Sequence, residues 1–228
     1  MNILKSFRSL TKFELGLWII SLITVTLSFL LAPKKDILSL LASLIGVTAL
    51  IFVSKGHVLG QILTVIFAVF YGIISVMFRY FGEMITYLFM TSPMAILSAI
   101  SWYKNPYKNS QEVKVNNPEK RQIITMILLS IIITVIFYFI LKSLDTANLV
   151  ISTISITTSF LASYLTYLRS PYYALAYSAN DIVLIILWIL ASIEDTSYIP
   201  MIFCFLMFFA NDIYGFINWQ RMKTYQAE

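Results

Sequence analysis

The chain has 228 residues, of which 59% are hydrophobic and 12% are charged, and its mean hydropathy is +0.84. A soluble domain carries roughly 25% charged residues, so this composition excludes an ordinary soluble fold and indicates a chain that lies mostly within lipid. The net charge of +5 comes from basic residues in short loops and tails, without an aromatic-interleaved basic patch. This distribution excludes nucleic acid as a partner.

Eight apolar segments follow one another along the chain. Each is about long enough to cross a bilayer, because about 20 residues span its hydrocarbon core. The first segment follows a basic start but lacks a small-residue cleavage site, which favours a retained span over a signal peptide. We therefore expect an all-α integral membrane protein with eight transmembrane helices and with lipid around it. The segments are 13–31, 37–54, 58–78, 84–103, 121–142, 147–168, 171–193 and 197–219.

The distribution of lysine and arginine predicts the orientation, since cytoplasmic loops carry the excess of these residues. With the N-terminus inside, the cytoplasmic side holds Lys5, Arg8, Lys12, Lys55, Lys104, Lys108, Lys114, Lys120, Arg121, Arg169, Arg221 and Lys223. The outer loops hold Lys34, Lys35, Arg79 and Lys142. The excess inside predicts a multi-pass protein of the cell membrane with both termini in the cytoplasm.

A weak internal repeat divides the chain. Residues 36–104 form a first three-helix repeat, which ends in Ser101-Trp102-Tyr103-Lys104, and 147–228 form a second repeat with a cytoplasmic tail, in which Asn218-Trp219-Gln220-Arg221 takes the matching place. Residues 105–146 then supply a cytoplasmic loop and a linking helix, and 1–35 an N-terminal tail and an extra helix. The linking helix would give both repeats the same direction, and parallel repeats place the solute site at their interface.

Two groups of residues are interpreted as structural. Ser152, Ser155, Ser159, Ser163 and Thr166 form a narrow helix stripe, for which close helix packing is favoured over solute contact. Trp102 and Trp219 lie near segment ends and are assigned to the interfacial aromatic belt.

Polar residues within three of the segments are candidates for binding, because such groups are costly in lipid and face a bundle interior or an aqueous cavity. Their helical spacing places them on single faces. Amides that donate and accept, tyrosines and a tryptophan suit a planar heteroaromatic ring with hydroxyls. The candidates are Gln61 and Tyr71 in the third segment; Tyr173, Tyr177, Asn180 and Trp188 in the seventh; and Asn211, Tyr214 and Asn218 in the eighth.

Alternatives remain open for several of these residues. Asn180 and Asn211 could instead bond helix to helix. Asp181 and Asp212 are interpreted as coupling or structural carboxylates, since a carboxylate at that depth must be paired, hydrated or protonated. For Asp181, a partner such as Arg169 or a neighbouring tyrosine is one possibility.

Enzymatic function is not expected. The chain has one histidine, His57, which is interpreted as a solvated loop residue, and one cysteine, Cys204, so it offers no disulfide framework and no metal site. It also lacks a nucleophile with its base and a glycine-rich phosphate loop, so no cofactor is expected. A receptor or scaffold would show saturable binding without flux.

The ending Asn211-Asp212-Ile213-Tyr214-Gly215-Phe216-Ile217-Asn218-Trp219, together with the preceding span that contains Asn180, resembles the PnuC vitamin transporters. The similarity extends over roughly 36–223 through the three-one-three helix order. It implies a SWEET-like fold, a homotrimer, and uptake of nicotinamide riboside or a related nucleoside-like vitamin by facilitated diffusion. A cytoplasmic kinase then traps the small-molecule substrate.

The resemblance implies substrate contacts for Asn211 and Tyr214. Where nicotinamide riboside carriers show a Trp-x-x-Trp pair before the asparagine matched to Asn180, this chain has tyrosines at Tyr172, Tyr173 and Tyr177. Carriers for thiamine, riboflavin or deoxynucleosides are therefore alternatives, as is a proton-coupled symporter of the same fold.

Overall fold

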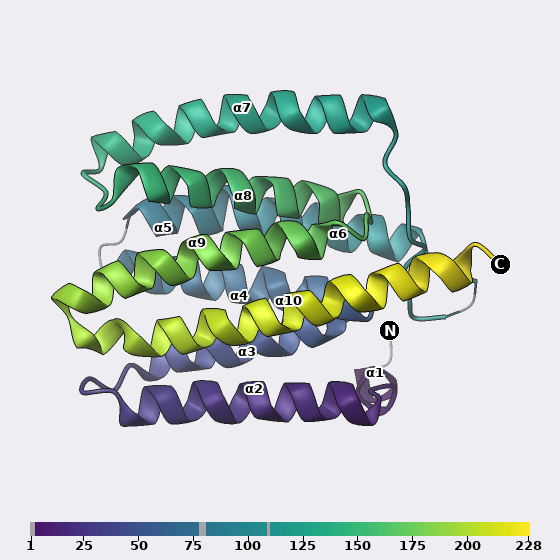
Figure 1. Ribbon diagram of the computed structural model, residues 1–228, viewed down its shortest axis with the longest axis horizontal. Coiled ribbons are helices and arrows are strands. Elements are labelled where there is room, and N and C mark those ends of the chain that lie inside the picture. The colour runs from purple at the N-terminus through teal and green to yellow at the C-terminus, as the bar shows by residue number, and fades with distance from the viewer. Residues whose placement is uncertain (1–2, 78–80, 109) are drawn as a thin grey trace.

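The computed structural model describes residues 3–77, 81–108 and 110–228, and it is a bundle of helices (Figure 1). Arg79 and the side chain of Ser75, a further polar residue of the third segment, lie outside the described part. The elements are α1 (Ile3–Arg8), α2 (Lys12–Leu31), α3 (Ile37–Ser54), α4 (Val58–Met77), α5 (Phe81–Ile85), the π-helical turn η1 (Thr86–Thr91), α6 (Ser92–Lys104), α7 (Lys120–Ser143), α8 (Leu149–Tyr167), α9 (Tyr173–Glu194), the 3-10 turn η2 (Thr196–Tyr198) and α10 (Ile199–Gln226).

The apolar segments of the sequence coincide with these helices. Within the described residues, six stretches are long and apolar enough to cross a membrane, namely α2, α3, α7, α8, α9 and η2 with α10. The two other segments correspond to α4, whose shorter apolar part covers 58–73, and to α5, η1 and α6 together. The all-helical fold class is therefore confirmed, and it contains several helices that could span a membrane.

Local sequence explains two features of these helices. Thr11 opens α2 with a capping box, in which its hydroxyl accepts from the Glu14 amide at 3.2 Å and its own amide donates to the Glu14 carboxylate at 2.6 Å. The π-helical turn precedes Pro93, and the Ser92 amide bonds the Tyr87 carbonyl five residues back. Because proline lacks an amide hydrogen and clashes with the preceding turn, the wider turn accommodates it within a continuous segment.

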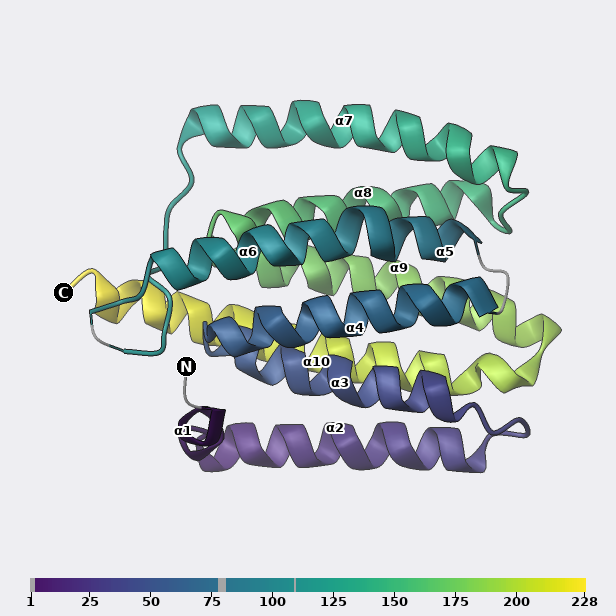
Figure 2. The same ribbon diagram turned by 180° about the vertical axis from the view of Figure 1, so that it is seen from behind.

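Six helices enclose the centre of the bundle. They pack in the closed order α3, α4, α6, α8, α9, α10 and back to α3. Two helices lie outside this ring on opposite sides, since α2 packs against α3 and α10, and α7 packs against α8 (Figures 1 and 2). The buried residues of α7 are Met126, Ser130, Phe137 and Leu141, one stripe on a largely exposed apolar helix. Such an exposed apolar surface is suited to lipid.

Helix α1, the first described helix, and the C-terminus lie at one end of the bundle (Figure 1), which we call the terminal end. It also carries the turn 55–57, the loop 105–119 and the turn 168–172, whereas the opposite, distal end carries the loops 32–36, 144–148 and 195–198. The first described helix and the C-terminus thus share one end of the bundle, which is compatible with the prediction that both termini are cytoplasmic.

Trp102 and Trp219 close the terminal end from within. Their rings lie 5.2 Å apart, and the Trp219 ring is 4.9 Å from that of Tyr173. Trp102 donates to the Thr166 carbonyl at the end of α8 (2.9 Å), and Trp219 donates to the Val53 carbonyl at the end of α3 (3.0 Å). Both tryptophans are fully buried. Their assignment to an interfacial belt was therefore wrong, because their indole groups satisfy helix-end carbonyls inside the protein.

Candidate functional site

A cavity of ≈ 530 Å³ lies inside the helix ring. Its lining includes four solvent-exposed residues of the distal end, Leu144, Asp145, Asn148 and Glu194. All of these except Leu144 are polar. No residue of the loop 105–119 or the turn 168–172 lines it. The cavity therefore opens at the distal end and stops below the tryptophans of the terminal end.

Helix α9 presents one continuous face to the cavity. Tyr177, Asn180, Asp181 and Trp188 lie on this face at helical spacing. The side-chain oxygen of Asn180 accepts a hydrogen bond from the Thr158 hydroxyl on α8 at 2.8 Å. This contact fixes the amide and leaves its two N–H donors for the cavity. Asn180 thus bonds a neighbouring helix, as the structural alternative states, and also faces the cavity.

Helix α10 turns different residues to the cavity from those that the sequence favoured. Phe205, Phe208 and Asp212 line it. Asn211 lies about 100° away around the helix, where its amide donates to the Ser21 hydroxyl on α2 at 3.0 Å and to the Met207 carbonyl at 2.7 Å. The structure therefore places Asn211 in the contact between α2 and α10.

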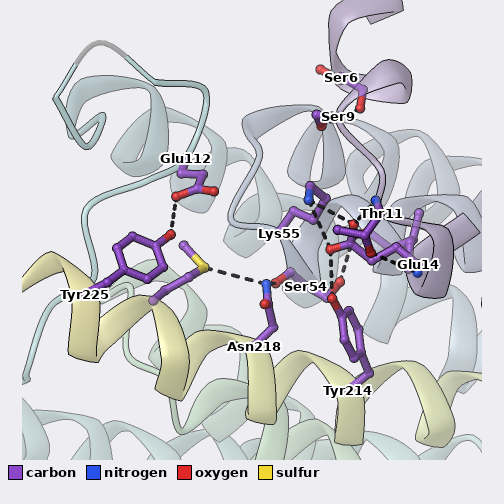
Figure 3. Close-up of polar contacts among 12 residues, drawn as sticks. Ser6, Ser9, Thr11, Glu14, Ser54, Lys55, Glu112, Tyr214, Asn218 and Tyr225 are labelled. Carbon is purple, nitrogen blue, oxygen red and sulfur yellow. Dashed lines mark hydrogen bonds and ion pairs between the residues drawn. The ribbon is translucent and has the colours of Figure 1, made fainter.

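Tyr214 and Asn218 lie three and seven residues after Asn211, on the same face of α10, and Figure 3 shows both pointing toward α2 and the end of α3. The Tyr214 hydroxyl donates to Glu14 at 2.8 Å, and the Asn218 amide donates to the Ser54 carbonyl at 2.9 Å. Glu14 is buried and also accepts two hydrogen bonds of 3.0 Å from Lys55. Neither Tyr214 nor Asn218 lines the cavity. Their polar groups instead join α2 and the end of α3 to α10.

Helix α4 and the π-helical turn form an aromatic wall. Gln61 and Tyr71 of α4 line the cavity, as the sequence predicts, together with Phe67. Tyr87 of η1 joins them, with its ring 4.7 Å from Tyr71 and 5.8 Å from Phe67. Phe67 and Tyr87 were missed by the sequence argument. A proline-broken apolar segment with Thr86, Tyr87 and Thr91 was the available signal, since π-turns are frequent at functional sites.

Helix α8 contributes hydroxyl groups. Ser152, Ser155 and Ser159 line the cavity, whereas Ser163 bonds the Tyr177 hydroxyl at 3.0 Å and Thr166 bonds the Ala162 carbonyl. The distal half of this stripe therefore lines the cavity, where the sequence favoured close helix packing. Its terminal half does pack, because Ser163 contacts Tyr177 of α9 there.

Tyr173 belongs to the terminal end rather than to the cavity. Its side chain is fully buried, and its hydroxyl donates to the Val53 carbonyl at 3.4 Å. Gly215 of α10 lies beside it, and a β-carbon at this position would be only 3.1 Å from the Tyr173 hydroxyl oxygen. Tyr173 therefore helps to close the floor beneath the cavity.

Two carboxyl groups meet on the cavity wall. Asp181 of α9 and Asp212 of α10 are both buried and lie within hydrogen-bonding contact of each other. The neighbour of Asp181 is thus a second carboxyl group, whereas Arg169 lies in the turn after α8 at the terminal end. Burial lowers the pKa of Arg169 there.

His57 also differs from the sequence interpretation. It lies in the turn between α3 and α4, is 3% exposed, and its Nδ1 has no hydrogen-bond partner within the described residues. Burial, with a smaller contribution from Lys55, lowers its pKa to about 4. The imidazole is therefore neutral. The interpretation of His57 as a solvated loop residue was wrong, because the side chain is buried.

Comparison with known proteins identifies the family. A profile described as nicotinamide mononucleotide transporter matches residues 36–221. The chain belongs to this family. A nicotinamide riboside transporter PnuC from Neisseria mucosa is 23% identical over 221 residues, which cover 95% of this chain and 84% of that protein. A crystal structure described as the vitamin B3 transporter PnuC has the same fold, with a TM-score of 0.81, 23% identity, and coverage of 96% of this chain and 94% of that one.

Membership of the PnuC family confirms the resemblance seen in the sequence and places the chain among membrane transporters. The matched residues 36–221 contain α7 and five of the six ring helices completely, and α10 as far as Arg221. The cavity lies entirely within this matched part. It is the candidate solute site of this PnuC family member.

Proposed function

We propose that this chain takes up nicotinamide riboside or a closely related nucleoside-like vitamin across the cell membrane by facilitated diffusion with alternating access. The cavity inside the helix ring carries the proposal, since its volume of ≈ 530 Å³ suits a small solute. The family, and the nicotinamide riboside transport for which the Neisseria mucosa relative is named, support this solute class.

The lining groups match the parts of a nucleoside. Tyr71, Tyr177 and Trp188 offer faces for an aromatic ring, and Gln61 and Asn180 offer amides for a carboxamide. The hydroxyls of Ser152, Ser155 and Ser159 are suited to ribose hydroxyls. We assign no solute contact to Tyr173, Asn211, Tyr214 or Asn218, whose contacts are with other helices.

The proposed topology has eight transmembrane helices, with two parallel three-helix repeats, 36–104 and 147–228, joined through 105–146. The ring order supports it, because a two-fold rotation takes α3, α4 and α6 onto α8, α9 and α10 and preserves every neighbour. The equivalent hydrogen bonds of Trp102 to α8 and Trp219 to α3 support the same rotation.

The proposed orientation puts the terminal end in the cytoplasm, since the lysine and arginine residues cluster there. The cavity then opens outward, and Trp102, Trp219 and Tyr173 form the closed inner side. Alternating access would exchange these two states. After release inside, a cytoplasmic kinase would phosphorylate the solute and prevent its return, and the protein would act as a homotrimer.

Solute identity is the point to test first. Purified protein is titrated by calorimetry with nicotinamide riboside, thiamine, riboflavin and a deoxynucleoside, and proteoliposomes without ion gradients are then loaded with the labelled ligand. We expect nicotinamide riboside to bind most tightly and to equilibrate across the membrane. Asn180→Ala should weaken binding, whereas the matched control Asn116→Ala, in the terminal loop, should leave it unchanged. Uptake that requires a proton gradient would contradict facilitated diffusion and select the symporter alternative.

A further inference from the structure

The charge of the cavity lining is one-sided. Its ionisable carboxyl groups are Asp145 and Glu194 at the mouth and Asp181 and Asp212 inside, and no lysine, arginine or histidine is among the described residues that line it. A low-dielectric cleft with charges of a single sign concentrates ions of the opposite sign. The cavity thus favours a cation over a neutral or anionic solute of the same shape.

The inner carboxyl pair lacks the partners that would neutralise it. Asp181 is 3% exposed, and its Oδ2 has no hydrogen-bond donor within the described residues. Asp212 lies against it and is also a carboxyl group. Two carboxylates are both acceptors, so the pair remains together only when it holds at least one proton. A pair with one shared proton carries a single negative charge.

The neighbouring helices do not supply a positive charge. Tyr177 faces the pair from α9 and Cys204 from α10, and both are neutral groups. Tyr173, on the terminal side, donates its proton to the Val53 carbonyl. Lys55 at the end of α3 is bound by Glu14, outside the ring. The remaining charge of the pair is therefore available to a ligand in the cavity.

We propose that Asp181 and Asp212 together form the counter-ion for a solute whose aromatic ring carries a fixed positive charge, as a pyridinium nucleoside does. This rests on the proposed function and deepens it, because it names the property of the ring that the site selects. The cationic ring lies against Tyr177, whose aromatic face also attracts cations, and next to the pair. The acidic residues at the mouth draw the same cation inward.

Nicotinamide riboside and its 1,4-dihydro form test this directly, because they share one shape and differ in the ring charge. Calorimetric binding to the wild-type protein should favour the cation by roughly ten- to a hundredfold, the range expected for a hydrogen-bonded or paired charge in a buried site. Asp212→Asn and Asp181→Asn should reduce this preference to a few-fold by weakening the cation alone. Asn180→Ala, the matched control, should weaken both forms equally and keep their ratio.

Equal affinity of the wild-type protein for both forms would overturn the proposal while nicotinamide riboside binding stood, and this comparison needs no variant to fold. An unchanged ratio in both aspartate variants that remain monodisperse by size exclusion would also overturn it. Binding of thiamine, which carries a fixed cationic ring, without binding of either nicotinamide form would change the vitamin and keep the inference. Binding of riboflavin or a deoxynucleoside alone would reject both.

Discussion

Glu14 shows how one buried charge determines which residues are free to bind a solute. Its carboxylate accepts from Lys55, from the Tyr214 hydroxyl and from the Thr11 amide. A buried carboxylate remains charged at low cost only with such a complete set of donors. The Tyr214 hydroxyl is one of these donors, and it is therefore unavailable to the cavity.

Lys55→Met should be strongly destabilising, because it leaves Glu14 buried without its cation. Breaking one partner of a buried pair costs about 3–5 kcal/mol, and we expect the thermal unfolding midpoint in detergent to fall by several degrees. The double variant Glu14→Gln with Lys55→Met should recover most of the loss, while Lys104→Met, at an exposed position, should change little. No loss in the single variant would mean that water hydrates Glu14.

His57 predicts a pH dependence of stability. Its pKa is about 4 in the folded protein against an ordinary value of 6.5, so the unfolded chain binds the proton more readily. The free energy of unfolding should therefore be highest above pH 6.5 and decrease toward pH 4, by roughly 1 kcal/mol for each pH unit. His57→Gln should flatten this part of the profile, measured by thermal unfolding between pH 4.5 and 7.5. Parallel profiles for the two proteins would reject the explanation.

At the scale of the element, α10 separates two functions by rotation alone. Asn211, Tyr214 and Asn218 point to α2 and α3, and Asp212 points to the cavity. One residue of displacement along a helix turns a side chain by about 100°, so adjacent members of one dipeptide serve different partners.

Asn211→Leu should therefore weaken the contact of α10 with α2 and leave solute affinity within about twofold. Loss of the hydrogen bond to Ser21 should cost about 1–3 kcal/mol of stability, since the serine hydroxyl stays buried without this partner. Ser21→Ala is the matched variant and should restore part of the stability when combined with it. A large loss of solute affinity with an unchanged free energy of unfolding would mean that Asn211 contacts the solute.

Tyr177 should contribute through its ring. Tyr177→Ala should remove roughly 1–3 kcal/mol of solute binding, the range seen for aromatic stacking on bases, and Tyr177→Phe should retain most of it. Tyr173→Ala should instead lower stability, because its ring packs on Trp219 beneath the cavity. If Phe and Ala at position 177 lose equal affinity, its hydroxyl rather than its ring binds the solute.

The helices could be predicted from the sequence because the bilayer sets their length, and each apolar segment meets that length on its own. The side of each helix that faces the cavity was harder to predict. Spacing correctly grouped Asn211, Tyr214 and Asn218, but the direction of the group depends on Glu14 and Ser21, which lie about 190 residues or more away in the chain. Tyr177 and Asn180 do line the cavity, since their hydrogen-bond partners, Ser163 and Thr158, lie on the neighbouring ring helix α8.

At the scale of the whole molecule, the two halves exchange equivalent contacts. Trp102 of the first half bonds the end of α8, and Trp219 of the second half bonds the end of α3. The turns that follow these helix ends are also equivalent, since Gly56 and Arg169 both adopt positive φ. The interface between the halves therefore depends on both tryptophans.

Trp102→Phe and Trp219→Phe should have similar effects, because each keeps the ring and leaves one buried carbonyl without its indole donor. Each carbonyl keeps a backbone amide donor, Arg169 for Thr166 and Gly56 for Val53. We therefore expect each change to cost about 0.5–1.5 kcal/mol of stability and to raise the rate of solute exchange by weakening the closed terminal end. Thermal unfolding and proteoliposome efflux would measure the two effects. Trp18→Phe, on the outer helix α2, is the control and should leave exchange unchanged. Strongly unequal effects would argue against the two-fold relation.

The loop 105–119 connects the halves and also covers the terminal end. The Val113 amide donates to the Gly56 carbonyl at 2.9 Å, the Asn116 amide donates to the Arg169 carbonyl at 3.0 Å, and the Val113 side chain is buried. The same short segment therefore holds the turn of one half and the turn of the other. If the halves separate at this end to release a solute, the loop must break its hydrogen bond to at least one of the two turns. The rate of opening would then be set by a tether that touches no solute, and variation in this loop could tune the speed of transport while leaving affinity intact.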